Sequence, residues 1–105
     1  MTRDELARAI VKLPGWRWMP GMRAVDTGLR LDEMTVDWDA RIPDLSDPAT
    51  LGCLLALVRE ALGDPAAHCE QLFTGDWAAF DQAGSLVAKG ATEAAALVAA
   101  LRAAS

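Results

Sequence analysis

Hydrophobic residues recur at helical spacing in three parts of the chain, and each part carries its own start and stop signals. In the first part, Thr2 and Glu5 form a capping box, in which each side chain can satisfy the other's free backbone N–H. The apolar stripe that follows consists of Leu6, Ala9, Ile10 and Leu13. Pro14-Gly15 ends this pattern. The sequence therefore predicts a short amphipathic helix.

A second helix is marked at both of its ends. Asp47 is a suitable N-cap, and Pro48 fits the first helical position, where a missing N–H costs nothing. Gly63 stands where a left-handed C-cap is expected, and Asp64-Pro65 prevents continuation. The apolar face contains Leu51, Leu54, Leu55, Val58 and Leu62, and is widened by Cys53 and Leu57. We expect this helix to be the most buried of the three.

The third helix begins after Thr92, a suitable N-cap. Glu93 then lies favourably beside the positive end of the helix dipole. Its apolar face contains Ala94, Leu97, Val98 and Leu101. Most of its other positions are alanine, which favours helix but supplies little packing energy. An alanine-faced helix of this kind could also form a homodimer contact.

The segments between the helices have the patterns of strands. Three short runs at 68–73, 77–81 and 85–89 are divided by turn signals at 74–76 and 82–84, which predicts a three-stranded antiparallel meander. Upstream, Met34, Val36 and Trp38 alternate with polar residues, as in a half-buried strand with an acidic outer side. Residues 22–32 could hold a hairpin around positions 26–28.

The predicted order is helix–(β)–helix–β–β–β–helix, which indicates an α+β fold built as a two- or three-layer sandwich of helices and an antiparallel sheet. With 105 residues, the chain fits a single domain, residues 1–105. Hydrophobic residues make up 52% of the sequence and the mean hydropathy is +0.15, which argues against disorder.

The sequence carries the features of a cytoplasmic protein. It has no run of about 18 uncharged apolar residues, so we expect no membrane segment or membrane partner. Its first residues lack the apolar core of a secretory signal. In the reducing cytosol, Cys53 and Cys69 are expected to be free thiols.

The net charge of −5 is concentrated in one segment. Residues 26–47 hold seven acids against Arg30 and Arg41, whereas the remainder of the chain holds eight acids and eight bases. This balance disfavours direct binding of nucleic acid, which needs clustered bases. Such acids are usually solvated surface charges, but they could also form a docking face for a basic partner. The candidate residues there are Asp32, Glu33, Asp37, Trp38 and Asp39.

A second candidate surface is the segment from Trp16 to Arg23, which combines two Trp, two Met and two Arg between a helix stop and a Pro-Gly break. If exposed, Trp16, Arg17, Trp18 and Arg23 would form an interface hot spot or a base-stacking platform, or would line a pocket. If buried, the two indoles would pack on the helices. An alanine-rich core needs large aromatic residues, so we favour burial of at least one Trp.

Nothing in the sequence nominates a reaction, a cofactor or a metal. His68 and Cys69 are adjacent on a predicted strand, so their side chains should point to opposite sides. There is no phosphate-binding loop, dinucleotide fingerprint, nucleophile elbow or zinc-ligand spacing. We therefore expect no catalytic, cofactor-binding or metal-binding residues.

Three segments, residues 13–22, 44–61 and 91–101, resemble in that order small bacteriophage and prophage proteins of unknown function that are grouped as the phage ABA sandwich domain. This resemblance implies a helix-and-sheet sandwich and a phage origin, and it assigns no functional residue. The final strand–strand–strand–helix run is also similar to a double-stranded-RNA-binding domain and to HicB-like antitoxins. Lys89, Thr92 and Glu93 stand where the RNA-binding domain carries its lysine cluster.

The resulting functional hypothesis is a non-enzymatic phage or prophage accessory protein that binds a host or phage protein in the bacterial cytosol. By analogy, such a protein could inhibit host machinery or a defence system such as CRISPR, with its acidic segment engaging a basic nucleic-acid groove. One alternative is a small-ligand or nucleotide-sequestering module whose pocket is lined by residues 16–22. Another is a HicB-like antitoxin or an RNA-binding domain.

Overall fold

The computed structural model describes residues 2–25 and 41–104, and it has the α+β architecture that the sequence predicts. The elements within these residues follow the order α1 (Arg3–Ile10), α2 (Pro48–Leu62), β1 (His68–Gln71), β2 (Trp77–Phe80), β3 (Leu86–Gly90) and α3 (Glu93–Ala104). The strand predicted around Met34 to Trp38 and the turn predicted at 26–28 lie outside the described residues.

Local capping signals fix where α1 and α2 begin and end. Thr2 Oγ1 accepts a hydrogen bond from the Glu5 backbone N–H at 3.2 Å, which forms one half of the capping box. Asp47 Oδ2 accepts from the Thr50 N–H at 3.0 Å, and Gly63 adopts the left-handed conformation with φ of +65°. These caps are the ones predicted. Residues 12 and 13 follow α1 as a tight turn ahead of Pro14.

The three strands form an antiparallel sheet in the order β1-β2-β3, as predicted. In its register His68 lies opposite Phe80, Glu70 lies opposite Ala78, and Ala78 lies opposite Lys89. Gly75 and Gly84 adopt positive φ in the two connecting turns, a conformation that side chains larger than hydrogen disfavour. The first strand ends at Gln71, earlier than the predicted 73, because the chain turns at 73–75, where the Gly75 N–H donates to the Leu72 carbonyl at 2.9 Å.

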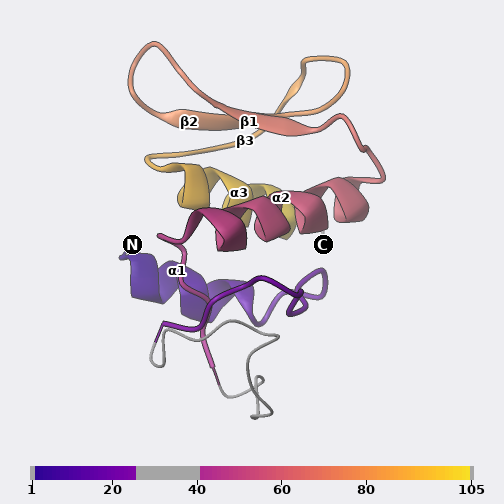
Figure 1. Ribbon diagram of the computed structural model, residues 1–105. Coiled ribbons are helices and arrows are strands. Elements are labelled where there is room, and N and C mark those ends of the chain that lie inside the picture. The colour runs from indigo at the N-terminus through magenta and orange to yellow at the C-terminus, as the bar shows by residue number, and fades with distance from the viewer. Residues whose placement is uncertain (1, 26–40, 105) are drawn as a thin grey trace.

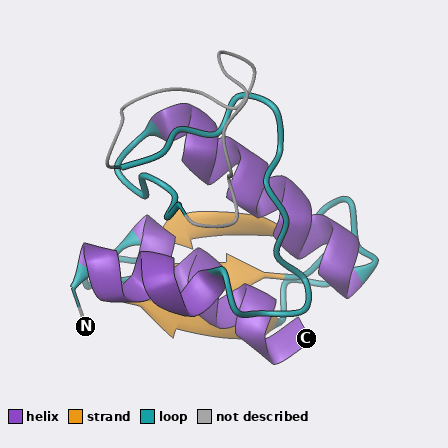
Figure 2. Cartoon of the chain, turned by 90° about the horizontal axis from the view of Figure 1, so that it is seen from below, coloured by secondary structure: helices purple, strands orange, loops and turns teal. Residues whose placement is uncertain are grey.

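The elements stack in three layers, with the sheet on one side, α2 and α3 in the middle, and α1 on the other side (Figure 1). Seen from the helix side, the helices lie over the strands (Figure 2). The buried core joins all three layers. Its large, fully buried members include Ile10, Met22, Leu54, Leu57, Leu97 and Leu101.

The most buried helix is α3, so the prediction for α2 is wrong. Six residues of α3 are buried, Ala94, Ala96, Leu97, Val98, Ala100 and Leu101, compared with four of α2. Small side chains explain this placement, since alanine allows the sheet and the other helices to approach the α3 backbone closely. Ala96 and Ala100 are fully buried within the chain, whereas Ala95, Ala99 and Ala103 are not, so the homodimer contact of this helix stays a prediction.

The segment after α1 returns along the helices and pairs with the residues that precede α2. Ala24 forms an antiparallel bridge with Pro43, the Val25 N–H donates to the Ile42 carbonyl at 3.1 Å, and the Asp44 N–H donates to the Arg23 carbonyl at 2.8 Å. Residues 22–25 therefore pair with residues 42–44 and not within the hairpin predicted at 22–32. The rest of that hairpin lies outside the described residues. None of the described helices is both long enough and apolar enough to cross a membrane.

Candidate functional site

The two tryptophans of the Trp16 to Arg23 segment serve the core. Both indoles are half-buried and pack against the core cluster. Their ring centroids lie 5.6 Å apart at an interplanar angle of 75°, an edge-to-face geometry that stabilises aromatic pairs. Met22 is fully buried beneath this segment. The structure thus favours the packing interpretation of Trp16 and Trp18 over an exposed stacking platform.

The two arginines of this segment are held by contacts within the chain. The Arg17 guanidinium meets Glu60 Oε1 at 2.6 Å, and this hydrogen bond and charge raise the pKa of Arg17 and lower the pKa of Glu60. Arg23 Nε lies 4.0 Å from Asp44 Oδ2. Arg17 is therefore engaged in an exposed ion pair, whereas the buried Arg23 Nε only approaches Asp44 and has no hydrogen-bond partner among the described residues.

The other five predicted partner-binding residues lie outside the described residues: Asp32, Glu33, Asp37, Trp38 and Asp39. Their role as an acidic docking face stays a prediction. Of the predicted partner-binding residues, the structure brings Trp16 and Trp18 into contact. It does not test the residues from Asp32 to Asp39.

His68 and Cys69 point to opposite sides of β1, as expected from strand geometry. Cys69 packs against the core, where burial, together with the charges of Glu93 and Glu70, raises its pKa to about 11. Burial and the charge of Asp47 also raise the pKa of Cys53. Both cysteines are free thiols, as predicted. Raised pKa values keep these thiols protonated at neutral pH, which makes them poor nucleophiles.

His68 belongs to the other side of the sheet. Its ring stacks on Phe80 with centroids 5.6 Å apart and an interplanar angle of 27°, and its Nε2 lies 2.8 Å from Glu70 Oε1. Within residues 2–25 and 41–104 no group of three or more His, Cys, Asp or Glu side chains is placed to hold a metal ion.

The sheet has one side that faces the helices and one that does not. Side chains alternate along β1 and β2, and cross-strand partners share a side. The register shifts by one residue at Ala79 and Phe80, so that Val87 and Ala88 both pack on the core while Leu86 lies opposite Phe80. Cys69, Ala79 and Ala88 pack on the core. The opposite side is turned away from the three helices, and both turns of the meander rise on it (Figure 1). We call this side, with the exposed Phe73, the outer sheet face; its residues are His68, Glu70, Phe73, Ala78, Phe80, Leu86 and Lys89. Ala78, between Glu70 and Lys89, is fully buried.

Apolar groups are unusually exposed on the outer sheet face. Phe73, in the turn between β1 and β2, is fully exposed, and Leu86, at the start of β3, is 54% exposed. The stacked rings of His68 and Phe80 lie between neighbouring strands on the same side. Phe73 and Leu86 lie at opposite ends of the sheet, because the turn after β1 adjoins Trp77 and the turn before β3 adjoins Phe80. Large exposed apolar side chains on one side of a sheet often mark an interaction site. The sequence pattern does not reveal this surface, because it places Phe73 inside a strand.

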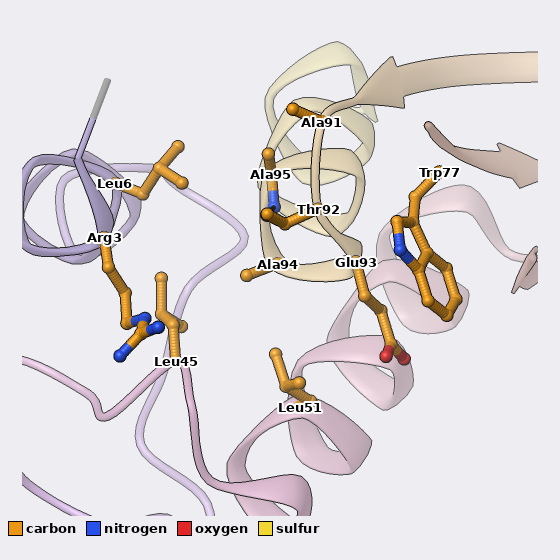
Figure 3. Close-up of a pocket in the computed structure, with 10 residues that line it drawn as sticks. All are labelled: Arg3, Leu6, Leu45, Leu51, Trp77, Ala91, Thr92, Glu93, Ala94 and Ala95. Atoms are coloured by element: carbon orange, nitrogen blue, oxygen red, sulfur yellow. Dashed lines mark hydrogen bonds between the residues drawn. The ribbon is translucent and has the colours of Figure 1, made fainter. Parts of the chain in front are cut away.

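A pocket of about 440 Å³ opens on the helix side of the sheet, where four segments meet. Its lining residues are Arg3, Leu6, Leu45, Leu51, Trp77, Ala91, Thr92, Glu93, Ala94 and Ala95 (Figure 3). None of these residues comes from the segment 16–22, so this pocket is not the one predicted there. No single sequence motif signals it, since its walls come from segments far apart along the chain.

Comparison of the chain with protein-family models, curated proteins and solved structures finds no match. The resemblance to phage sandwich proteins therefore stays a prediction. What the structure itself defines is the class of fold, an α+β sandwich of helices on one side of an antiparallel meander.

Proposed function

We propose that this chain is a non-enzymatic protein-binding module and that the outer sheet face is its interface. The observation that carries the proposal is the full exposure of Phe73 together with the half-exposed Leu86 on a side of the sheet turned away from the helices. Exposed phenylalanine is unfavourable in water, and burial of aromatic side chains supplies much of the binding energy at protein interfaces.

The charges around the outer sheet face specify the chemistry of the partner. Glu70 lies on that face, and Asp76 and Asp81 lie in the adjoining turns, whereas Lys89 supplies a base. The balance is acidic and agrees in sign with the net charge of −5 for the whole chain. The proposed partner therefore presents an apolar patch surrounded by basic side chains, and charge complementarity speeds its association.

The biological setting belongs to the same proposal. The resemblance of three segments to phage proteins supports a phage or prophage accessory protein acting on a host or phage protein in the bacterial cytosol. A partner with a basic nucleic-acid groove would fit the acidic surface. Occlusion of that groove by this chain would inhibit the partner.

The test compares three variants in pull-downs from a bacterial lysate, read by mass spectrometry. The first replaces both exposed side chains, Phe73→Ser and Leu86→Ser. The second, Val25→Ser, is the matched control, because Val25 is 41% exposed but lies outside the sheet, in the chain segment that pairs with residues 42–44. A protein retained by the wild type and by Val25→Ser, but lost with the double variant, supports the proposal.

The third variant separates the outer sheet face from the acidic segment of the sequence. Asp37→Lys combined with Asp39→Lys reverses two charges there. Loss of the partner with this variant, but not with Phe73→Ser and Leu86→Ser, would show that the interface is the acidic segment and would overturn the proposal. We also expect capture to weaken as salt is raised, since the attraction between opposite charges is screened.

A further inference from the structure

We infer that the pocket between α1, α2, β2 and α3 binds a small zwitterion with an apolar body, of the kind represented by a short apolar peptide with free termini. This site is distinct from the outer sheet face, because Trp77 and the start of α3 line it from the helix side of the sheet. A pocket of about 440 Å³ is within the size range of small-molecule sites.

The interior of the pocket selects an apolar body. Leucines line it from three segments: Leu6 from α1, Leu45 from the residues before α2, and Leu51 from α2. Alanines of the α3 start complete the wall, with Ala94 facing the interior between the leucines (Figure 3). Apolar ligand surface placed here would leave water for a hydrocarbon environment, which is favourable in proportion to the area buried.

Two opposite charges stand on opposite sides of this interior. The Arg3 guanidinium lies beside Leu45, and the Glu93 carboxylate lies beside the indole of Trp77 (Figure 3). In the part of the chain that the structure describes, neither side chain takes part in a hydrogen bond or an ion pair, and the two do not pair with each other. A ligand with complementary charges at its two ends would therefore meet a partner at each end.

Ligands with one charge fit less well. An apolar acid would pair with Arg3 but would leave the half-buried Glu93 carboxylate against hydrocarbon, which costs free energy. An apolar amine would pair with Glu93 and gain cation–π attraction from Trp77, but it would leave Arg3 without a partner. The zwitterion satisfies both charges, with its ammonium at Glu93 and its carboxylate at Arg3.

The test titrates the whole chain by calorimetry with leucine, Leu-Leu and Leu-Ala-Leu, and then with the N-acetylated and C-amidated forms of the best binder. We expect saturable binding of a free form and weakening of about threefold or more on acetylation. Amidation is expected to weaken binding less, because Arg3 is exposed and Glu93 is half-buried. These titrations use the unsubstituted chain, so their interpretation does not depend on the folding of any variant.

Two substitutions assign the ends of the ligand. In Glu93→Gln, acetylation should no longer weaken binding, and in Arg3→Gln, amidation should no longer do so. Arg8→Gln and Glu60→Gln are the matched controls, since each removes the same charge from an exposed residue outside the pocket. Circular dichroism checks that each variant keeps its helices.

The inference is overturned if none of the three free forms binds saturably up to about 10 mM. It is also overturned if blocked and free forms bind equally, or if the control variants change the response to blocking as much as the pocket variants do. The double variant Phe73→Ser and Leu86→Ser should bind the free form unchanged, so failure of one proposal leaves the other intact.

Discussion

A single methyl group added at Gly90 should destabilise the fold substantially. Gly90 ends β3 next to the first turn of α3, the closest approach of sheet and helix that any described glycine shows. A Cβ built there would lie 2.5 Å from the Ala96 backbone N and 2.7 Å from both the carbonyl carbon and the Cβ of Ala95. Two of these three atoms belong to the helix backbone, which cannot turn aside as a flexible side chain would.

The magnitude follows from two opposing terms. Overpacking of a core contact costs about 1–3 kcal/mol. Replacing glycine by alanine also lowers the entropy of the unfolded chain, which stabilises by about 0.4–1 kcal/mol where the backbone conformation allows it. Gly90 does not have a positive φ, so this gain applies in full. The steric term is larger, and we expect Gly90→Ala to lower the free energy of unfolding by about 1–2 kcal/mol.

The chain offers a control with the same chemical change and the opposite expected sign. Gly52 lies on the exposed side of α2, and nothing lies within 4 Å of the position that an added methyl group would take. Gly52→Ala should therefore stabilise the protein by about 0.5–1 kcal/mol through helix propensity. Urea unfolding followed by circular dichroism gives both values from the shift in midpoint. A Gly90→Ala chain as stable as the wild type would refute the close approach of β3 and α3.

Three further predictions concern side chains whose partners are known. Thr50→Val should lower the free energy of unfolding by about 1–3 kcal/mol, because it removes the hydroxyl that donates to Asp47 and accepts from the Arg23 N–H. As the control, Thr74→Val at an exposed position should leave the urea midpoint unchanged. Cys69 should react slowly with iodoacetamide at pH 8 in the folded chain and rapidly in urea, as measured by peptide mass spectrometry. Arg17→Gln should shift the urea midpoint only slightly, and the shift should vanish at high salt, since the pair with Glu60 is exposed.

The Cys69 thiol also predicts the direction of a pH effect. Its pKa is about 11 in the folded chain against 9.0 for an ordinary thiol, so the folded state holds the proton more tightly. Its contribution to stability is therefore complete below about pH 9 and is lost as the pH rises towards about 11. A Cys69→Ala chain should lack this part of the alkaline decline in urea midpoint. Equal declines in both chains would contradict the raised pKa.

Helix and turn boundaries could be predicted because their causes are local. Thr2, Asp47 and Thr92 each cap the helix that follows them, and Gly63 ends α2 in the left-handed conformation. Each cap involves residues three or four positions apart, so one stretch of sequence contains both donor and acceptor. The order of the strands follows in the same way, because short turns can join only neighbouring antiparallel strands.

The placement of the layers could not be predicted, because it depends on distances between segments. The leucine-rich α2 and the alanine-rich α3 share the middle layer, yet α3 buries more of its residues, since its alanines permit close approach. The pocket has the same origin, with Arg3 and Glu93 brought to one cavity from opposite ends of the chain. The exposure of Phe73 was not predicted for a different reason. The strand β1 ends at Gln71, two residues before the end of the predicted run at 68–73, so Phe73 lies in the turn.

The central position of α3 also determines when this protein can fold. α3 comes after every other described helix and strand, yet it contacts α1, α2 and all three strands. The sheet and the first two helices therefore leave the ribosome before α3, whose residues bury their inner surfaces, has been synthesised. Until Leu101 has been synthesised, the core that joins the three layers lacks its α3 residues. Folding should accordingly occur in one late cooperative step, and the nascent chain should remain open to chaperones and proteases until then.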